Sequence, residues 1–167
     1  MLIYIRHAED DTSDIYKHDG SLTKVGKKQA KYFANYLIKK YGYPKIIYTS
    51  PFYRSRETAK KMKKLVPKSV EIFADSHVSK YFTQSQQKSP DVRKDTLKYN
   101  IPILETKHDV YNRVTNHFHH LKHHHTDDIV WIITHGIIVH YISKYVGQKT
   151  KGNVNYLQYI AIKDKKK

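Results

Sequence analysis

The sequence predicts an α/β fold, a three-layer α/β/α sandwich in which helices cover both faces of a mostly parallel central sheet. Short apolar runs alternate along the chain with longer segments of helical periodicity, the pattern of parallel strands joined by helical crossovers. The apolar runs are continuous, as expected for strands that are buried on both faces. Charged or imidazole side chains follow several of these runs, where the carboxyl ends of parallel strands collect a ligand site.

The first half of the chain predicts three strands and two helices. The strands are short runs of apolar and β-branched residues, and the helices show apolar residues at helical spacing. Gly42 is a plausible stop for the first helix. Pro51 suits the first turn of the second helix, and Pro67 prevents that helix from extending further. In order, we expect a strand over 2–5, a helix over 23–41, a strand over 45–49, a helix from 51 to about 65, and a strand over 70–73.

The second half begins with a stretch that lacks a convincing period and is rich in Ser, Gln, Pro and Lys. We interpret it as a long loop or insertion. Helical spacing then returns, and Asp127 and Asp128 separate that helix from the most apolar strand. We therefore expect an insertion over 75–102, a helix over 108–121, a strand over 129–134, a helix over 137–146, a strand over 156–162 and a solvated tail over 163–167.

Length and composition indicate one globular domain over residues 1–167. At this length folding hides roughly 70% of the unfolded surface. Hydrophobic residues at 39% and aromatic residues at 13% are too many for a disordered chain. The absence of cysteine excludes disulfides, thiolate metal sites and thiol nucleophiles. The apolar run before Arg6 is too short for a signal peptide and no stretch has the length of a membrane span, so we expect a cytoplasmic, intracellular protein without a membrane partner.

The net charge of +16 favours partners that carry phosphate. Nucleic acid is one such partner, but the basic residues are spread along the chain rather than gathered in an arm or stripe. Five of the basic residues are arginine, and abundant Lys, Ile, Tyr and Asn are also what an AT-rich genome would give. Charge therefore supports an acidic substrate without naming it, and the sequence does not indicate the oligomeric state.

Four polar groups lie at or just after the ends of predicted strands. Arg6 and His7 follow the first strand, Arg54 follows the second, and His135 follows the strand over 129–134. Parallel strands would bring these side chains to one edge of the sheet. Two guanidinium groups, two imidazoles and the starts of the helices near Pro51 and Gly136 would form a site for a tetrahedral dianion, with phosphate as the expected ligand.

These residues stand in four motifs: Arg6-His7-Ala8-Glu9, then Leu22-Thr23 with Gly26 and Gln29-Ala30, then Ser50-Pro51 with Arg54 and Thr58-Ala59, and finally Thr134-His135-Gly136. The motifs resemble those of the histidine phosphatase superfamily, the relatives of phosphoglycerate mutase. The resemblance spans residues 2 to about 146 and implies a phosphoglycerate mutase-like fold. A segment from Glu105 to Arg113 is also similar.

The resemblance implies a phosphatase that acts through a phosphohistidine intermediate on His7. Arg6 and Arg54 would bind the phosphoryl oxygens, and a protonated His135, with Gly136, would complete the phosphate site. The arginines would provide the positive charge, so we expect no metal and no cofactor. The substrate would be a phosphorylated small molecule or a phosphoprotein. A phosphoglycerate mutase-type transferase, a catalytically weak phosphate-binding module and a polyanion binder remain alternatives.

The sequence departs from the family pattern in three places. Ala8 replaces the usual glycine, and His140 stands where an arginine is common. The family also places a glutamate after the third strand as the general acid, and this chain has no glutamate there. The candidates are Lys80, which aligns closest to that position, Asp75, the nearest carboxylate, and His77.

Several further residues have ordinary interpretations. Glu9 and Asp10 are interpreted as loop carboxylates. Six histidines lie between His117 and His125, and two pairs share a helix face, His119 with His123 and His120 with His124. Because they straddle a predicted helix end, where imidazolium suits the helix dipole, we do not assign them a metal.

Overall fold

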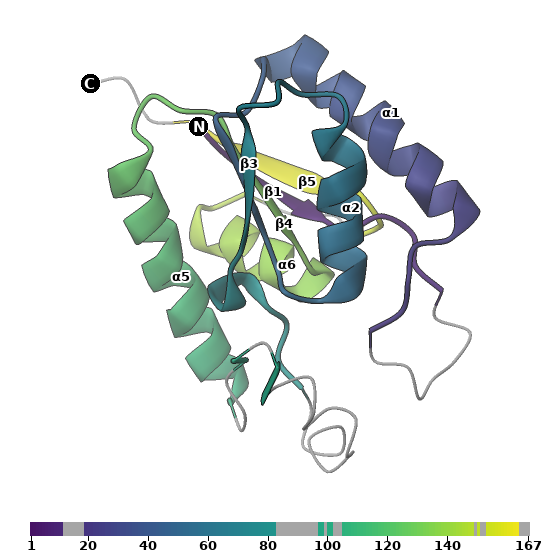
Figure 1. The fold of residues 1–167 in the computed structure, drawn as a ribbon. Coiled ribbons are helices and arrows are strands. Elements are labelled where there is room, and N and C mark those ends of the chain that lie inside the picture. Colours follow the sequence, from purple (N-terminus) through teal and green to yellow (C-terminus); the bar gives the residue numbers. More distant parts are fainter. Residues whose placement is uncertain are drawn as a thin grey trace.

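The central sheet determines where the site lies. The computed structural model describes residues 1–11, 19–82, 97–98, 100–101, 105–148, 150 and 153–163. Within these residues five strands form one sheet in the order β3-β2-β4-β1-β5 (Figure 1). The strands are β1 (Leu2–Arg6), β2 (Ile46–Thr49), β3 (Glu71–Ala74), β4 (Val130–Thr134) and β5 (Tyr159–Ile162).

Strand direction follows the prediction of a mostly parallel sheet. The pairs β1 with β4, β2 with β4 and β2 with β3 are parallel. Among the described strands, β5 alone is antiparallel, and it pairs with β1 at one edge. The carboxyl ends of β1, β2, β3 and β4 therefore point to the same side of the sheet, which is the condition for a shared ligand site.

Helices cover both faces of the sheet, so the predicted three-layer architecture is confirmed (Figure 1). In β1, Ile3 and Ile5 pack in one cluster with residues of α1 and α2, whereas Leu2 and Tyr4 pack in another with residues of α5 and α6. This split follows from the alternation of side chains along a strand. The helices are α1 (Lys24–Tyr41), α2 (Tyr53–Lys63), the short 3-10 helix η1 (Ser76–Val78), α5 (Lys107–His124) and α6 (Gly136–Tyr145).

Capping residues explain the starts of the two longest helices. The Thr23 hydroxyl accepts a hydrogen bond from the backbone N–H of Gly26 at the start of α1. Thr106 and Asp109 form a reciprocal capping box at the start of α5. At its other end α5 continues three residues beyond the predicted Leu121, where basic side chains suit the negative end of the helix dipole.

Two predicted element starts were wrong by more than one residue. Helix α2 begins at Tyr53 instead of Pro51, because Phe52 has an extended backbone and acts as the N-cap. Strand β5 begins at Tyr159 instead of Tyr156, because a turn precedes it in which Leu157 has a positive φ of 56°. Periodicity alone does not reveal either local change of direction.

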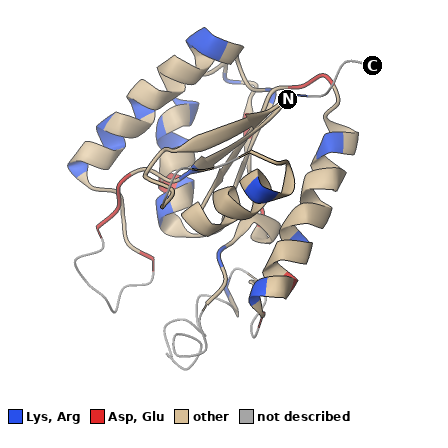
Figure 2. Ribbon diagram, turned by 180° about the vertical axis from the view of Figure 1, so that it is seen from behind, with Lys and Arg blue, Asp and Glu red and all other residues tan. Residues whose placement is uncertain are grey.

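The predicted insertion over 75–102 is described only in part. Its first residues form η1, and residues 83–96, 99 and 102 lie outside the described residues. Residues 164–167 of the predicted tail also lie outside them. No helix among the described residues is long and apolar enough to cross a membrane. Lys and Arg residues are distributed over several helices, among them α1, α2 and α5 (Figure 2).

Candidate active site

Three strand ends bring the predicted site residues together. The backbone ladder continues one residue beyond the strands, since His7 N donates to Thr134 O at 2.8 Å and Ser50 N donates to Ile133 O at 2.9 Å. His7, Ser50 and His135 therefore follow three neighbouring strands at one edge of the sheet. The His7 and His135 rings are 5.4 Å apart between centroids. As expected from the sequence, segments that are distant along the chain meet at this edge of the sheet.

The His7 ring has its two nitrogens in different environments. Nδ1 lies 2.9 Å from the Ala8 carbonyl oxygen, which can only accept, so we assign the ring proton to Nδ1. Nε2 then carries a lone pair and accepts a hydrogen bond from Arg54 Nε at 3.1 Å. Burial lowers the pKa of His7 well below its usual value, and the charge of Arg54 lowers it further. His7 is therefore a neutral imidazole at pH 7 with an available nucleophilic nitrogen.

Arg54 is held in place by two carboxylates. It lies in the first turn of α2 and is 6% exposed. Its guanidinium lies 3.8 Å from Asp10 Oδ2 and 4.0 Å from Asp19 Oδ1. Burial lowers the pKa of Arg54, and the two carboxylates oppose that shift. Arginine stays protonated in proteins, so this side chain is a fixed buried cation beside His7 Nε2.

Asp10 belongs to this site, and the sequence analysis missed it. Its interpretation as an ordinary loop carboxylate was wrong, because it is 7% exposed and Oδ1 lies 3.9 Å from His7 Nδ1. Glu9 does lie in a connecting segment and accepts a hydrogen bond from the Thr23 hydroxyl at 2.7 Å. The sole sequence signal for Asp10 was its position three residues after His7.

His135 acts as the N-cap residue of α6 and contacts Ser50. The Ser50 hydroxyl lies 2.9 Å from His135 Nε2, and the Phe52 ring packs edge-on at 5.1 Å. Burial lowers the pKa of His135 well below its usual value, with Arg54 adding to the effect. The ring is therefore neutral at pH 7 in this structure, and the protonated His135 expected in the phosphate site stays a prediction. Gly136 begins α6, so its N–H lies at the positive end of that helix.

Arg6 reaches the site while anchored at its other side. Its Nη1 donates to the Val154 carbonyl oxygen, and the guanidinium carbon lies 4.2 Å from the centroid of the Tyr156 ring. The Tyr156 ring is also 5.8 Å from that of His7. Arg6 is close enough for its charge to lower the pKa of His7. Sequence reasoning did not identify Tyr156, which stands outside the matched motifs.

The structure separates the three candidates for the general acid. Lys80 lies beside the His7 site, where its charge lowers the pKa of both His7 and His135. Its ammonium nitrogen lies 5.6 Å from the centroid of the Phe52 ring. Burial, aided by Arg54, lowers the pKa of Lys80 to about 8. Asp75 and His77 are instead hydrogen-bonded to each other, and they belong to a second cluster that is described below.

Arg113 holds the segment that carries Lys80. Its guanidinium pairs with both Glu105 oxygens at 2.6 and 2.7 Å and donates to the carbonyl oxygens of Ser76, His77 and Ser79. Arg113 and Glu105 are the ends of the segment that resembles the family, and both side chains are largely buried. This contact fixes the chain between η1 and Lys80 against α5.

The remaining motif residues pack the segment after His7. Ala8 is fully buried, and its N–H donates to the Thr58 hydroxyl at 3.1 Å. Gly26 lies against the backbone of Glu9, where a Cβ would be 2.0 Å from the Glu9 carbonyl oxygen. These contacts join α1 and α2 to the loop that positions His7. His140 lies on the exposed face of α6, with Nδ1 3.3 Å from the Thr150 hydroxyl.

The model of the histidine phosphatase superfamily (branch 1) matches residues 2–159 of the chain. The chain belongs to this superfamily. A comparison of this superfamily member with curated proteins finds no match. Its resemblance to solved structures is close in fold and distant in sequence.

Three solved structures illustrate how this histidine phosphatase superfamily member compares with known folds. Bacillus stearothermophilus YhfR matches with a TM-score of 0.72 and 20% identity over 98% of this chain and 91% of its own. The mycobacterial glucosyl-3-phosphoglycerate phosphatase in complex with VO3 matches with a TM-score of 0.67 and 19% identity over 95% of this chain and 88% of its own. The ecdysone phosphate phosphatase from Bombix mori in complex with tungstate matches with a TM-score of 0.69 and 16% identity over 95% of this chain and 86% of its own. At these identities the matches establish the fold.

Proposed function

We propose that this chain hydrolyses a phosphomonoester or a phosphoprotein through a phosphohistidine intermediate on His7. The observation that carries the proposal is the environment of the His7 ring. Its Nδ1–H is fixed by the Ala8 carbonyl, and its Nε2 lone pair faces the Arg54 guanidinium at 3.1 Å. A neutral imidazole held beside a fixed cation is suited to attack the phosphorus of an anion that the cation binds.

In the first step, the Nε2 lone pair forms a bond to phosphorus while the bond from phosphorus to the leaving oxygen breaks. Arg6 and Arg54, with the N–H of Gly136 at the start of α6, would stabilise the charge on the other phosphoryl oxygens. A bound dianion would also oppose the effect of Arg54 on His135 and raise the pKa of its ring. His135 would then donate a hydrogen bond to the phosphoryl group as a cation.

The leaving oxygen needs a proton unless it belongs to a good leaving group. Lys80 is the residue that can supply it, because its pKa of about 8 keeps the ammonium form in the majority at pH 7 and makes it a stronger acid than ordinary lysine. In the second step, water would attack the phosphohistidine and give up a proton to the neutral Lys80 amine as the nitrogen–phosphorus bond breaks. This cycle restores both His7 and Lys80.

The cations of the chain itself can provide the electrostatic stabilisation, so the proposal includes no metal or cofactor in the hydrolysis. The substrate class is supported by two of the similar solved structures, a glucosyl-3-phosphoglycerate phosphatase in complex with VO3 and an ecdysone phosphate phosphatase in complex with tungstate. For this chain the substrate is proposed to be a phosphorylated small molecule or a phosphoprotein.

The direct test is turnover of p-nitrophenyl phosphate in the presence of a chelator. The wild-type protein should release nitrophenolate, and His7→Ala should reduce kcat at least about 10³-fold, because the variant lacks the proposed nucleophile. His140→Ala, an exposed histidine on α6, is the matched control and should keep wild-type turnover. Equal turnover in His7→Ala and the wild type would refute the proposal.

A specific observation also favours a second candidate function. Where relatives in this family place a carboxylic acid, this chain has Lys80, a cation that would strengthen phosphate binding. A phosphate-binding module of weak activity would bind inorganic phosphate tightly but would turn over p-nitrophenyl phosphate no faster than its His7→Ala variant.

A further inference from the structure

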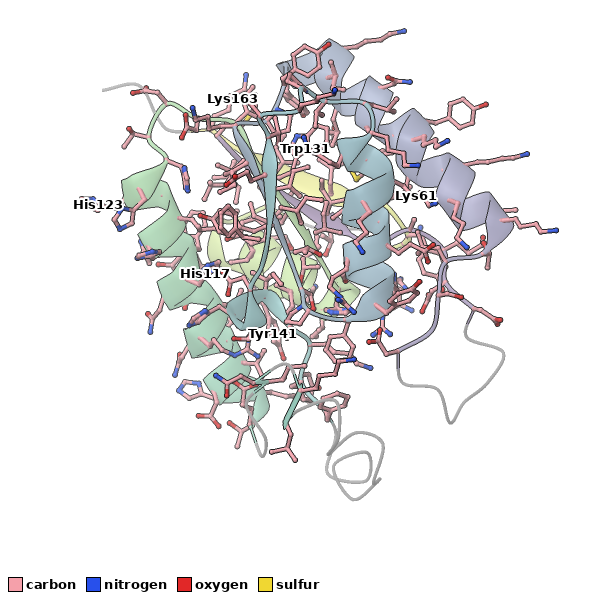
Figure 3. The ribbon with its side chains drawn as sticks, viewed as in Figure 1. Lys61, His117, His123, Trp131, Tyr141 and Lys163 are labelled. Carbon is pink, nitrogen blue, oxygen red and sulfur yellow. The ribbon has the colours of Figure 1, made fainter. Side chains whose placement is uncertain are left out.

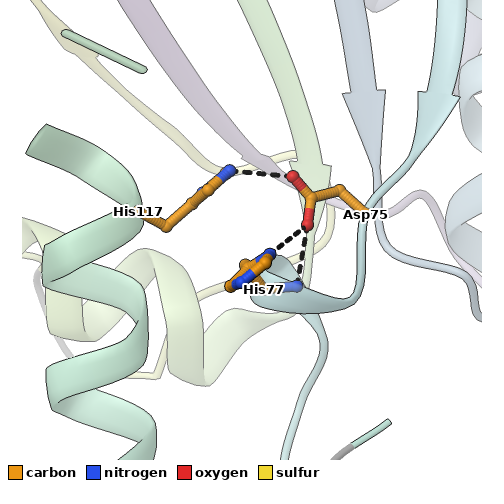
Figure 4. A group of neighbouring side chains, drawn as sticks. All are labelled: Asp75, His77 and His117. Carbon is orange, nitrogen blue, oxygen red and sulfur yellow. Dashed lines mark hydrogen bonds and ion pairs between the residues drawn. The ribbon is translucent and has the colours of Figure 1, made fainter. Parts of the chain in front are cut away.

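A second group of reactive side chains lies away from His7, at the end of β3 (Figure 4). Asp75 Oδ1 accepts a hydrogen bond from His77 Nδ1 at 2.9 Å, and Asp75 Oδ2 accepts one from His117 Nε2 at 2.8 Å. One potential ligand atom from each residue lies within 4.8 Å of the others. The two rings are almost parallel, 5.2 Å apart between centroids. We call these three residues the Asp75 cluster.

The cluster is built on three separate elements. Asp75 follows β3, His77 belongs to η1, and His117 lies midway along α5. Asp75 is fixed further by the backbone N–H of His77 at 2.8 Å, and the carbonyl oxygen of His77 accepts from Arg113. The three donor atoms therefore converge from positions fixed by the fold, whereas adjacent histidines on one helix would have independent rotamers.

His117 is unusual for a histidine that serves packing alone. It is 7% exposed, and its buried Nδ1 has no hydrogen-bond partner among the described residues. A buried ring that leaves half of its hydrogen-bonding capacity unused is costly. Figure 3 shows His117 on the sheet side of α5 and His123 on the outer side. The nitrogen that faces Asp75 is Nε2, at 2.8 Å from Oδ2, and this atom is the candidate ligand.

We propose that the Asp75 cluster binds a divalent transition-metal ion of the Zn²⁺ class. Two imidazole nitrogens and one carboxylate oxygen are the donors of open three-ligand zinc sites, in which water completes the coordination. Zinc bonds of about 2.0 Å in tetrahedral geometry put neighbouring ligand atoms about 3.3 Å apart. The two rings now contact different oxygens of Asp75, Oδ1 at 2.9 Å and Oδ2 at 2.8 Å, so these side chains must rearrange for one oxygen and both nitrogens to bind the ion. The His77 side chain is 59% exposed, which leaves a path for the ion.

The protons of the cluster have a place to go when the metal binds. As a carboxylate, Asp75 can only accept, and it accepts a hydrogen bond from each of the two rings. Each ring nitrogen that faces Asp75 carries a proton, and the metal would take the place of these two protons. In His117 the proton would then reside on Nδ1, and any excess proton would leave to solvent.

A row of other histidines continues along α5 and makes the experiment demanding. The His120 ring stacks on the His117 ring with 6.4 Å between the centroids, and the centroids of the His124 and His120 rings are 4.3 Å apart. His123 and His124 are exposed and could collect metal ions without any built site. The test must therefore separate the Asp75 cluster from this row, and Asp75 and His77 are useful because neither belongs to α5.

The test is calorimetric titration of the untagged full chain with ZnCl₂. The wild type should bind one Zn²⁺ per chain in a tight step, and His77→Ala and Asp75→Asn should each weaken that step at least about tenfold. His77→Ala removes an exposed side chain and should fold normally, which a thermal melt without metal would verify. The matched control, His123→Ala with His124→Ala, should retain the tight step within about twofold.

Three results would overturn the proposal. They are wild-type affinity in His77→Ala, loss of the tight step in the control that removes His123 and His124, and no Zn²⁺ binding by the wild type at micromolar concentrations. Mg²⁺, which prefers oxygen ligands, should give no comparable step. Because the readout is metal binding and not turnover, the result is independent of whether His7 is a nucleophile.

Discussion

At the scale of single residues, the site depends on groups whose pKa values are moved by burial and by neighbouring cations. His7 and His135 are neutral because both rings are buried next to Arg54. Burial and the charge of Arg54 likewise lower the pKa of the Lys80 ammonium group to about 8. The same cations that would bind a phosphate therefore prepare the nucleophile and the proposed acid for reaction near pH 7.

The pKa of Lys80 gives a prediction about pH and leaving groups. An acid works only while protonated, so kcat/KM for an alkyl phosphate should be highest below about pH 8 and should fall as the pH rises through the pKa of Lys80. Lys80→Met should lower this rate about 10² to 10⁴-fold and should affect p-nitrophenyl phosphate far less, because nitrophenolate leaves without a proton. Steady-state assays of both substrates from about pH 6 to 10 measure kcat/KM.

The control for this prediction is Lys60→Met, which removes an exposed lysine from α2 and should leave both rates unchanged. Equal losses with the alkyl and the aryl substrate in Lys80→Met would assign Lys80 to phosphate binding instead of proton transfer.

Motif residues could be predicted from the sequence because each lies next to a recognisable strand or helix start. Arg6, His7 and His135 follow apolar runs directly. Asp10 and Tyr156 could not be predicted, since their position depends on where a loop turns back toward the sheet. The charge state of His135 also required the structure, because it depends on burial and on the nearby Arg54.

At the scale of secondary-structure elements, the sequence pattern predicted the five strands and the helices α1, α2, α5 and α6, but not the short helix η1 inside the predicted insertion. It could not predict that β5 lies beside β1 in the antiparallel direction, because pairing partners depend on tertiary contacts. The sequence did contain the Leu22-Thr23 motif with Gly26, and the structure supplies its physical reason. Gly26 allows α1 to approach the loop after His7 so closely that no side chain fits between them.

Gly26→Ala should therefore be strongly destabilising. The added Cβ would lie 2.0 Å from the Glu9 carbonyl oxygen, so either the helix or the loop must move. We expect a loss of about 1–3 kcal/mol in the free energy of unfolding, although alanine normally favours a helix over glycine. Gly136→Ala is the matched control, since its Cβ would meet nothing closer than 3.5 Å, and its unfolding free energy should change by less than about 1 kcal/mol. Urea denaturation compares the two variants, and similar stability in both would contradict this account of the motif.

At the scale of the whole molecule, the basic field should affect how the substrate arrives. The net charge is +16, and the lysines and arginines lie on several helices (Figure 2). Such a distribution attracts anions over long distances without providing a specific stripe for a polymer. The field acts before binding, whereas the cations at the site act on the bound substrate.

Ionic strength should separate these two effects. Raising the salt concentration from about 20 to 300 mM should lower kcat/KM for a phosphate ester several-fold, because screening weakens the attraction of the anion. The value of kcat should change little, since Arg54 and its neighbours are buried. If kcat/KM did not depend on salt, the net charge would have no part in substrate capture.

The proposed reaction transfers the phosphoryl group to His7. It is tested most directly by mixing the protein rapidly with labelled p-nitrophenyl phosphate, stopping the reaction in alkali, which preserves phosphohistidine, and locating the label by peptide mass spectrometry. The account predicts one labelled residue, His7, whose label disappears when unlabelled substrate is chased through the site. A label on any other residue, or turnover with the full wild-type rate in His7→Ala, would contradict it.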